Sequence, residues 1–244
     1  MISISKILAY ALLVYFFIGM LGKVSAEPNF AKPDLSERIS RNIEGWRVSI
    51  DPSLVEAPHE ELGKESLKSL ANHLQRVRYL VPKDRLAELQ TLRIWIDREH
   101  SLHNMQYHPS RAWLVKNDHD PRLEKHIHIP RAQRLLDPKQ WAKHPYAILH
   151  ELAHGYHHQI LGFDHGPIRD MYDQIRRDGS YQKVLSHKGD IVEHYGLSNH
   201  KEYFAESTEA YFGVNDFYPF VQAELKEHDP RMFRLLKEIW GEIK

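Results

Sequence analysis

The sequence predicts an α+β domain in which a small sheet packs against several helices. Short segments at 46–50, 91–97 and 125–129 alternate between apolar and polar residues, which is typical of strands. Apolar residues recur at helical spacing over Glu65–Leu80 and again after residue 218. The chain has 244 residues, 42% of them hydrophobic, which is enough for one sizeable core.

The first 26 residues are typical of a targeting segment. Lys6 supplies a positive start, residues 7–22 form an apolar run, and Val24-Ser25-Ala26 offers small residues for cleavage. The small residues favour a cleaved signal peptide and therefore a secreted or periplasmic protein. The alternative is an uncleaved membrane anchor over residues 7–22, because the run is long for a signal and short for a span.

Charge and cysteine content narrow the function classes. Cleavage would remove two lysines and no acid, so 33 basic residues become 31 against 33 acidic ones. This near-neutral balance argues against a nucleic-acid partner, and a membrane partner requires an uncleaved N-terminus. The absence of cysteine excludes disulfides, thiolate metal sites and a cysteine nucleophile. The sequence leaves the oligomeric state open.

The chain after the targeting segment is expected to form an N-terminal arm over residues 27–45 and one catalytic domain over 46–244. Pro28 and Pro33 lie in the polar arm, and no internal repeat divides the rest. The elements expected next are a strand over Trp46–Ile50, a helix over Glu65–Leu80, a short helix containing Leu86 and Leu89, and a strand over Thr91–Asp97.

Histidines and aromatic residues are concentrated between Arg98 and Pro130. Their irregular spacing favours a loop that lines a cleft over a second metal site, although both interpretations stay open. Within this stretch, Lys125–Ile129 alternates and is predicted to be a strand with His126 and His128 on one face. Such a strand could bind an extended peptide by main-chain pairing.

A helical run is expected from Asp137 to Ile160, bent near Pro145 and ended by Gly162. It contains the sequence H-E-x-x-H. His150 and His154 are four residues apart, so both imidazoles lie on one helix face and can bind one ion. Glu151 lies about 100° around the helix, where its carboxylate can act as general base on a metal-bound water.

A third ligand is needed from elsewhere. His157 follows at i+3 from His154, but one helix rarely supplies three ligands to a tetrahedral ion. The better candidates are Glu202, Glu206 and Glu209, which form one acidic stripe on a predicted helix and need a positive partner. The alternative is that Asn199 and Glu202 form a capping box and that the stripe is solvated.

These motifs, in this order, resemble the gluzincin metallopeptidases, specifically the lethal-factor-like catalytic domain. The resemblance rests on the H-E-x-x-H of 150–154, Tyr195-Gly196 and Glu202-Tyr-Phe-Ala-Glu206, and covers about 146–212. It implies a zincin-like α+β fold with Glu202 as third zinc ligand, Glu206 as an outer partner of the ligands, and Tyr195 as donor to the oxyanion. The metzincin pattern is not met, because Ile160 stands where its last histidine should be.

The sequence therefore predicts an exported zinc metallopeptidase with one Zn²⁺ per chain, acting on a peptide or protein substrate and favouring internal bonds. Two helices, over 218–227 and 229–240, are expected to pack a helical C-terminal lobe. One alternative is a catalytically inactive protein of the same fold that binds metal, peptides or cell-wall material. Another is a histidine-rich metal buffer, and a di-iron helical bundle is less favoured still.

Overall fold

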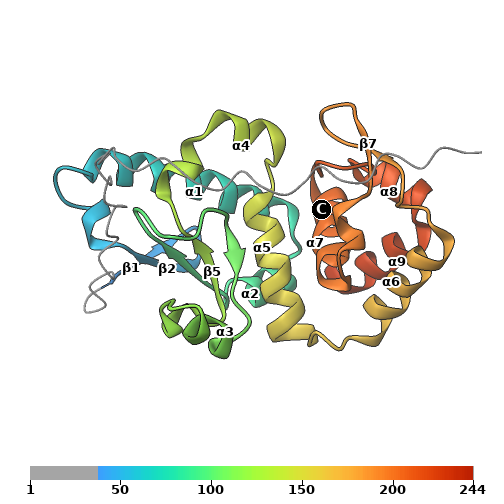
Figure 1. Cartoon of the computed structure of the whole chain (residues 1–244), viewed down its shortest axis with the longest axis horizontal. Coiled ribbons are helices and arrows are strands. Elements are labelled where there is room, and N and C mark those ends of the chain that lie inside the picture. The colour runs from blue at the N-terminus through green and yellow to red at the C-terminus, as the bar shows by residue number, and fades with distance from the viewer. Residues whose placement is uncertain (1–37, 244) are drawn as a thin grey trace, which may run out of the picture. The chain divides into compact units, whose positions relative to one another are not determined.

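The structure is a computed structural model, and it describes residues 38–243. Five strands form one mixed sheet in the order β1-β2-β3-β5-β4 (Figure 1). Strands β2, β3 and β5 are parallel, and the two outer strands are antiparallel to their neighbours. The strands are β1 (Ile39–Ile43), β2 (Trp46–Ile50), β3 (Arg93–Ile96), β4 (Gln106–Tyr107) and β5 (His126–Ile129).

Helices precede, separate and follow these strands. The α-helices are α1 (Glu60–Leu80), α2 (Lys83–Leu89), α3 (Arg111–Lys116), α4 (Pro138–Lys143), α5 (Ala147–Tyr156), α6 (Gly166–Asp178), α7 (His200–Phe212), α8 (Gln222–His228) and α9 (Pro230–Trp240). A small hairpin, β6 (Val184–Leu185) and β7 (Ile191–Val192), lies between α6 and α7. The architecture confirms the predicted α+β, zincin-compatible fold. The predicted targeting segment lies outside the described residues.

The core forms where the apolar face of the sheet meets the helices. Val48, Ile94 and Ile127 lie opposite one another in register and are fully buried. Leu70 and Leu74 of α1 join the same cluster, as the helical spacing predicted. The predicted N-terminal arm spanned 27–45, and its residues 39–43 instead form β1, because their backbone pairs with β2 along its whole length.

The edge of the sheet differs from expectation. The strand predicted at 125–129 is confirmed as β5, but β5 lies between β3 and β4 and has no free edge for a peptide. Strand β1 forms one edge of the sheet, and the edge strand on this side is β4, in a segment expected to be loop. Its position is fixed by pairing with β5 and by the Tyr107 hydroxyl, which lies 2.7 Å from Nδ1 of His158.

The helical run predicted from residue 137 to 160 is divided. Helix α4 ends at Lys143, and α5 begins at Ala147, so the break contains Pro145, which has no backbone N–H to continue a helix. Residues His157–Leu161 continue α5 as a wider π-helical turn. Gly162 then ends the run with a φ of 83°, a conformation that favours glycine.

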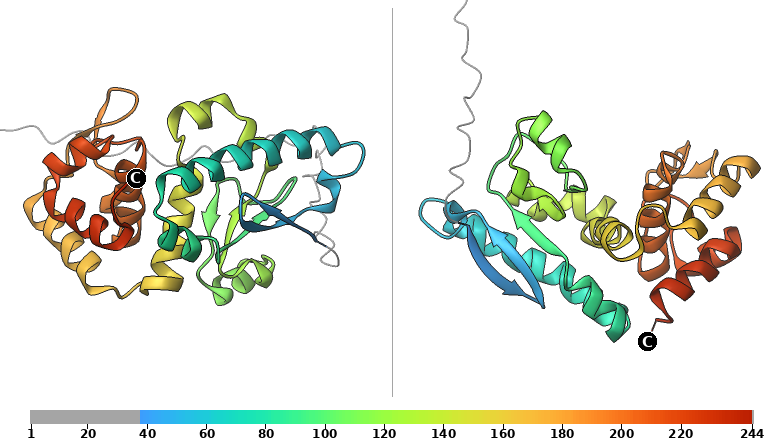
Figure 2. Two further views of the ribbon diagram at one scale, coloured as in Figure 1. Left: turned by 180° about the vertical axis from the view of Figure 1, so that it is seen from behind. Right: turned by 90° about the horizontal axis from the view of Figure 1, so that it is seen from below.

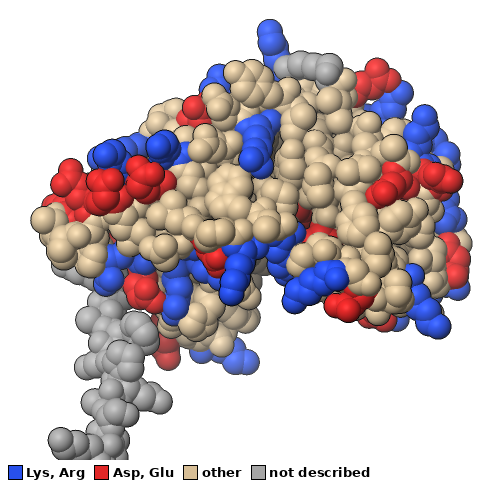
Figure 3. Space-filling model, turned by 90° about the horizontal axis from the view of Figure 1, so that it is seen from above, with Lys and Arg blue, Asp and Glu red and all other residues tan. Residues whose placement is uncertain are grey.

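The C-terminal helices α6 to α9 gather beyond α5, and α7 runs beside α5 (Figures 1 and 2). Every residue of α7 from Tyr203 to Phe212 is buried, because α5, α6, α8 and α9 all pack against it. Basic and acidic side chains are interspersed on the face seen in Figure 3. Within residues 38–243, no helix is both long and apolar enough to cross a membrane.

Candidate metal centre and catalytic cleft

Helix α5 holds the two histidines of the H-E-x-x-H motif in a buried position. All ten of its residues are buried, and Gly155 faces Ile127 of β5 and Leu92, which directly precedes β3. A Cβ atom on Gly155 would lie 2.9 Å from Cδ1 of Leu92, inside van der Waals contact. Glycine therefore allows α5 to lie against the sheet, with His150 and His154 facing α7.

Glu202 on α7 completes a compact set of three ligand atoms. Nε2 of His150 lies 3.1 Å from Nε2 of His154, and each nitrogen lies 3.2 Å from Oε2 of Glu202. Ligands about 2.0 Å from a tetrahedral zinc ion stand about 3.3 Å apart, so these atoms match one face of such a tetrahedron. The residues therefore fit a zinc ion and leave its fourth position free.

Opposite charges couple the histidines and the carboxylates of this group. Burial alone would lower the pKa of His150, but hydrogen bonds with Glu202 and Glu209 raise it well above its usual range. Burial would raise the pKa of Glu202, but its hydrogen bonds with His150 and His154 hold it well below the usual range. The Glu202 carboxylate therefore stays ionised. Without a metal, a protonated imidazole balances its charge, and a divalent ion would take the place of that proton on Nε2.

A second carboxylate, that of Glu209, contacts the other ring nitrogen of His150. Oε1 of Glu209 lies 2.7 Å from Nδ1 of His150 and 2.8 Å from Nε2 of His144, and Glu209 is fully buried. An imidazole that donates Nδ1–H to a carboxylate presents its Nε2 lone pair to a metal. Glu206 was expected to be this partner of the ligands, but its Oε1 lies 3.7 Å from Nδ1 of His150, beyond hydrogen-bond distance.

Helix geometry allows either carboxylate to reach His150, and the packing of α5 against α7 decides between them. Glu209 is seven residues after Glu202, so the two side chains lie on one face of α7, two turns apart. Glu209 was part of the predicted acidic stripe, and this i+7 spacing was the available indication of its role. His144 was missed, because nothing in its local sequence connects it to residue 209.

Burial and the neighbouring Glu209 raise the pKa of Glu206 to about 8.

Glu151 and Tyr195 line the same cleft as the three ligands. The cleft has a volume of about 830 Å³, and its walls include the loop of residues 101–105 and strand β4. Within the described chain, the Glu151 carboxylate makes no hydrogen bond or ion pair, so it is available to a water or substrate in the cleft. This part of the histidine-rich segment therefore lines a cleft, as predicted.

Tyr195 is held by a tight turn over α7. It begins a short 3₁₀ helix, Tyr195–Leu197, that is capped by His194, whose Nδ1 accepts a hydrogen bond from the Gly196 N–H at 2.9 Å. A Cβ on Gly196 would lie 3.2 Å from Cα of Tyr203, so glycine permits this close approach. Tyr195 is 50% exposed, and burial together with Glu202 raises the pKa of its hydroxyl, which keeps it protonated.

His157, the other third ligand considered from the sequence, points elsewhere. Its ring is fully buried and packs against the rings of Phe163, His200 and Phe204. It does not belong to the ligand group of His150, His154 and Glu202. The alternative of a solvated acidic stripe is not met either. Asn199 does cap α7, accepting from the N–H groups of Lys201 and Glu202, but Glu206 and Glu209 are buried.

The comparisons with known proteins bear on the second half of the chain. Residues 140–239 match the family model described as anthrax toxin lethal factor, N- and C-terminal domain. The match links this part of the chain to the lethal factor family. It includes both helices of the metal centre, α5 and α7, and Tyr195. Neither a search of curated proteins nor a search of solved structures gave a match.

Proposed function

We propose that this chain is an exported zinc-dependent metallopeptidase of the gluzincin type that hydrolyses internal peptide bonds. The observation that carries the proposal is the triangle of ligand atoms from His150, His154 and Glu202, with edges of 3.1 to 3.2 Å, beside an unpaired Glu151. The match to the lethal factor family supports it. The predicted cleavable targeting segment supports export.

The three ligands would hold one zinc ion, which supplies a Lewis acid that activates water and polarises the substrate carbonyl. Glu151 accepts the proton of the attacking water and delivers it to the leaving amine. Tyr195 donates its hydroxyl proton in a hydrogen bond to the carbonyl oxygen as negative charge develops there. Glu209 keeps the His150 ring oriented throughout.

The edge strand β4 supports an extended peptide as the substrate. In the described sheet β4 pairs with β5 on one side, and it also lines the cleft. An exposed strand edge binds an extended chain through main-chain hydrogen bonds. A substrate paired there would lie across the metal centre, which favours cleavage within a chain. An inactive binding protein of this fold is disfavoured, because metal binding alone has no use for Glu151 at this position.

The test compares residues 27–244 with the Glu151→Gln variant on a mixed peptide library, with products identified by mass spectrometry. We expect zinc bound at the His150–His154–Glu202 site in both proteins, and cleavage in the unmodified protein alone. The exposed Glu227→Gln is the matched control and should cleave like the unmodified protein. Equal cleavage by Glu151→Gln, or zinc binding that survives His154→Ala at this site, would contradict the proposal.

A further inference from the structure

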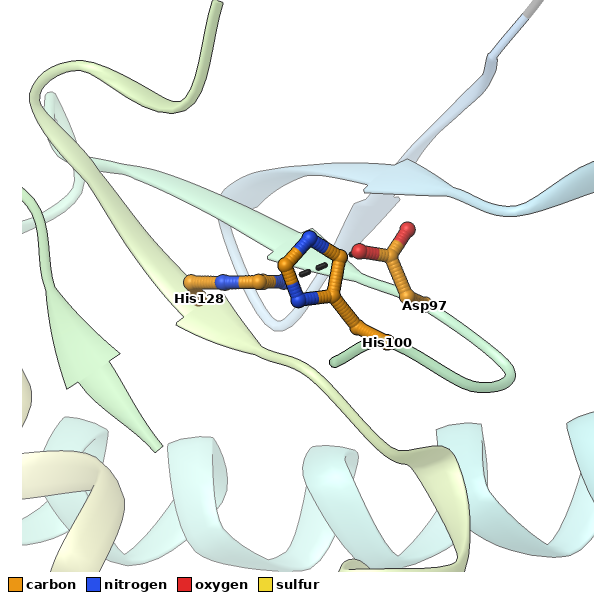
Figure 4. Close-up of side chains that lie close together, drawn as sticks. All are labelled: Asp97, His100 and His128. Atoms are coloured by element: carbon orange, nitrogen blue, oxygen red, sulfur yellow. Dashed lines mark hydrogen bonds and ion pairs between the residues drawn. The ribbon is translucent and has the colours of Figure 1, made fainter. Parts of the chain in front are cut away.

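A second group of metal-binding side chains lies away from the cleft. Asp97 directly follows β3, His128 lies on β5, and His100 lies in the loop after β3 (Figure 4). One ligand atom from each of these residues lies within 4.8 Å of the other two. We propose that these three residues form a second site for a divalent transition-metal ion.

This group occupies the opposite face of the sheet from α5. Ile127 points toward Gly155 of α5, so its neighbour His128 points to the other face, since side chains alternate along a strand. Trp95 pairs with His128 in register and packs with Leu114 of α3. The second site is therefore separated from the H-E-x-x-H site by the sheet itself.

Hydrogen bonds already hold His128 and Asp97 side by side, as two ligands of one ion would lie. Nε2 of His128 lies 2.9 Å from Oδ2 of Asp97, which suits two neighbouring ligands of one ion. Nδ1 of His128 lies 3.0 Å from Nε2 of the buried His108, which can accept its proton and orient the ring. His108 therefore orients the His128 ring in the same way that Glu209 orients the His150 ring.

The carboxylate of Asp97 divides its two oxygens between separate partners. Oδ1 accepts from the guanidinium of Arg38 and, at 3.0 Å, from Nε1 of Trp95, which leaves Oδ2 directed at His128. These bonds lock the carboxylate in place. They also neutralise part of its charge, so a cation held here depends mainly on its imidazole ligands.

His100 is the least constrained of the three ligands. It is half-buried, and in the described chain its ring has one hydrogen bond, accepted by Nδ1 from the Leu102 N–H at 3.1 Å. Its ring lies edge to face with His128, with ring centres 4.9 Å apart. Coordination through Nδ1 would replace this one local hydrogen bond, and the partly exposed side chain leaves the ring accessible to an ion.

The donor set defines the class of ion. Two imidazole nitrogens and one carboxylate oxygen suit Zn²⁺, Co²⁺, Ni²⁺ or Cu²⁺, whereas Ca²⁺ and Mg²⁺ require mostly oxygen ligands. The remaining coordination positions would be filled by water or by a ligand from outside the chain. The structure thus brings together His100, His108 and His128, three of the histidines whose spacing in the sequence is irregular.

The test counts bound ions per chain after loading the purified protein with Zn²⁺ or Co²⁺ and removing free metal. His154→Ala empties the first site and His100→Ala the second, and the exposed His103→Ala is a matched control in the same loop. We expect two ions in the unmodified protein and in His103→Ala, one in each single-site variant, and none in the His154→Ala/His100→Ala double variant.

Two further measurements distinguish the loss of a metal ligand from a folding defect. Circular dichroism should be unchanged in His100→Ala, because this residue is half-buried in a loop, and the Co²⁺ absorption bands that persist in His154→Ala should vanish when His100 is also replaced. One ion in the unmodified protein and none in His154→Ala would overturn the proposal. So would two ions in His100→Ala, or one ion left in the double variant.

Discussion

Glu209 of α7 and His150 of α5 are 59 residues apart in sequence and meet with Oε1 and Nδ1 separated by 2.7 Å. Their contact is fully buried and is extended by His144 on the other side of the carboxylate. Burial alone would raise the pKa of Glu209, but His144 and His150 lower it to about 2, so it is ionised at neutral pH. It therefore acts on His150 as a fixed negative charge.

Replacing Glu209 by glutamine should weaken zinc binding by about 10- to 100-fold, because the His150 ring loses its charged acceptor. The affinity is read from the loss of peptidase activity as a chelator buffers free zinc. Glu206→Gln is the matched control. Its pKa of about 8 makes Glu206 largely neutral at pH 7, so the amide changes little. Equal losses in the two variants would contradict the role given to Glu209.

Tyr195→Phe should lower kcat by about 10²- to 10³-fold with little change in bound zinc, because the hydroxyl acts on charge that develops during the reaction. The phenyl ring preserves the packing of the turn at Gly196. Steady-state kinetics on the best library peptide would measure the effect. Tyr79→Phe, at a position 73% exposed, should leave kcat unchanged. A rise in KM at constant kcat would instead assign Tyr195 to substrate binding.

His73 should make the protein less stable in acid. Burial, with a smaller effect from Arg76, lowers its pKa from 6.5 to about 4 in the folded state. Between these values the unfolded chain binds more protons. The contribution of His73 to the free energy of unfolding is therefore complete above about pH 6.5. It is lost as the pH falls toward 4, by about 1.4 kcal/mol per pH unit.

His73→Phe should reduce this slope, because phenylalanine has no group that titrates. Its ring can also keep the stacking on Trp141, where the ring centres lie 4.0 Å apart. Urea unfolding at several pH values, in the presence of a chelator, gives the free energy of unfolding for both proteins. Identical slopes between pH 6.5 and 4 would show that His73 is protonated as readily in the folded protein as in the unfolded chain.

Gly63→Ala should destabilise the fold even though Gly63 lies within α1, where alanine is normally favoured by about 1 kcal/mol. A Cβ there would lie 1.7 Å from the backbone oxygen of Leu54, so α1 would have to move away from that turn. We expect a loss of at least about 2 kcal/mol, measured by thermal or urea unfolding. Gly166→Ala, with open space around its Cβ, should not destabilise the protein.

Local periodicity explains what was predicted correctly. The alternation in 46–50, 91–97 and 125–129 identified three strands, and the spacing of apolar residues identified α1, because both patterns depend on nearest neighbours along one element. Gly162 as the end of the helical run is likewise a local effect. The break before α5 was expected only as a bend, since Pro145 marks where helical hydrogen bonding fails but not how far the chain turns.

The sequence by itself determined which residues can bind one ion from a single helix, since the i,i+4 spacing of His150 and His154 fixes their common face. It also placed Glu202 in a helix with an acidic stripe. The tertiary structure decided which carboxylate of that stripe meets His150, which strand forms the sheet edge, and that Asp97, His100 and His128 converge. These relations depend on the registers between elements distant in the chain, which packing fixes and local patterns do not encode.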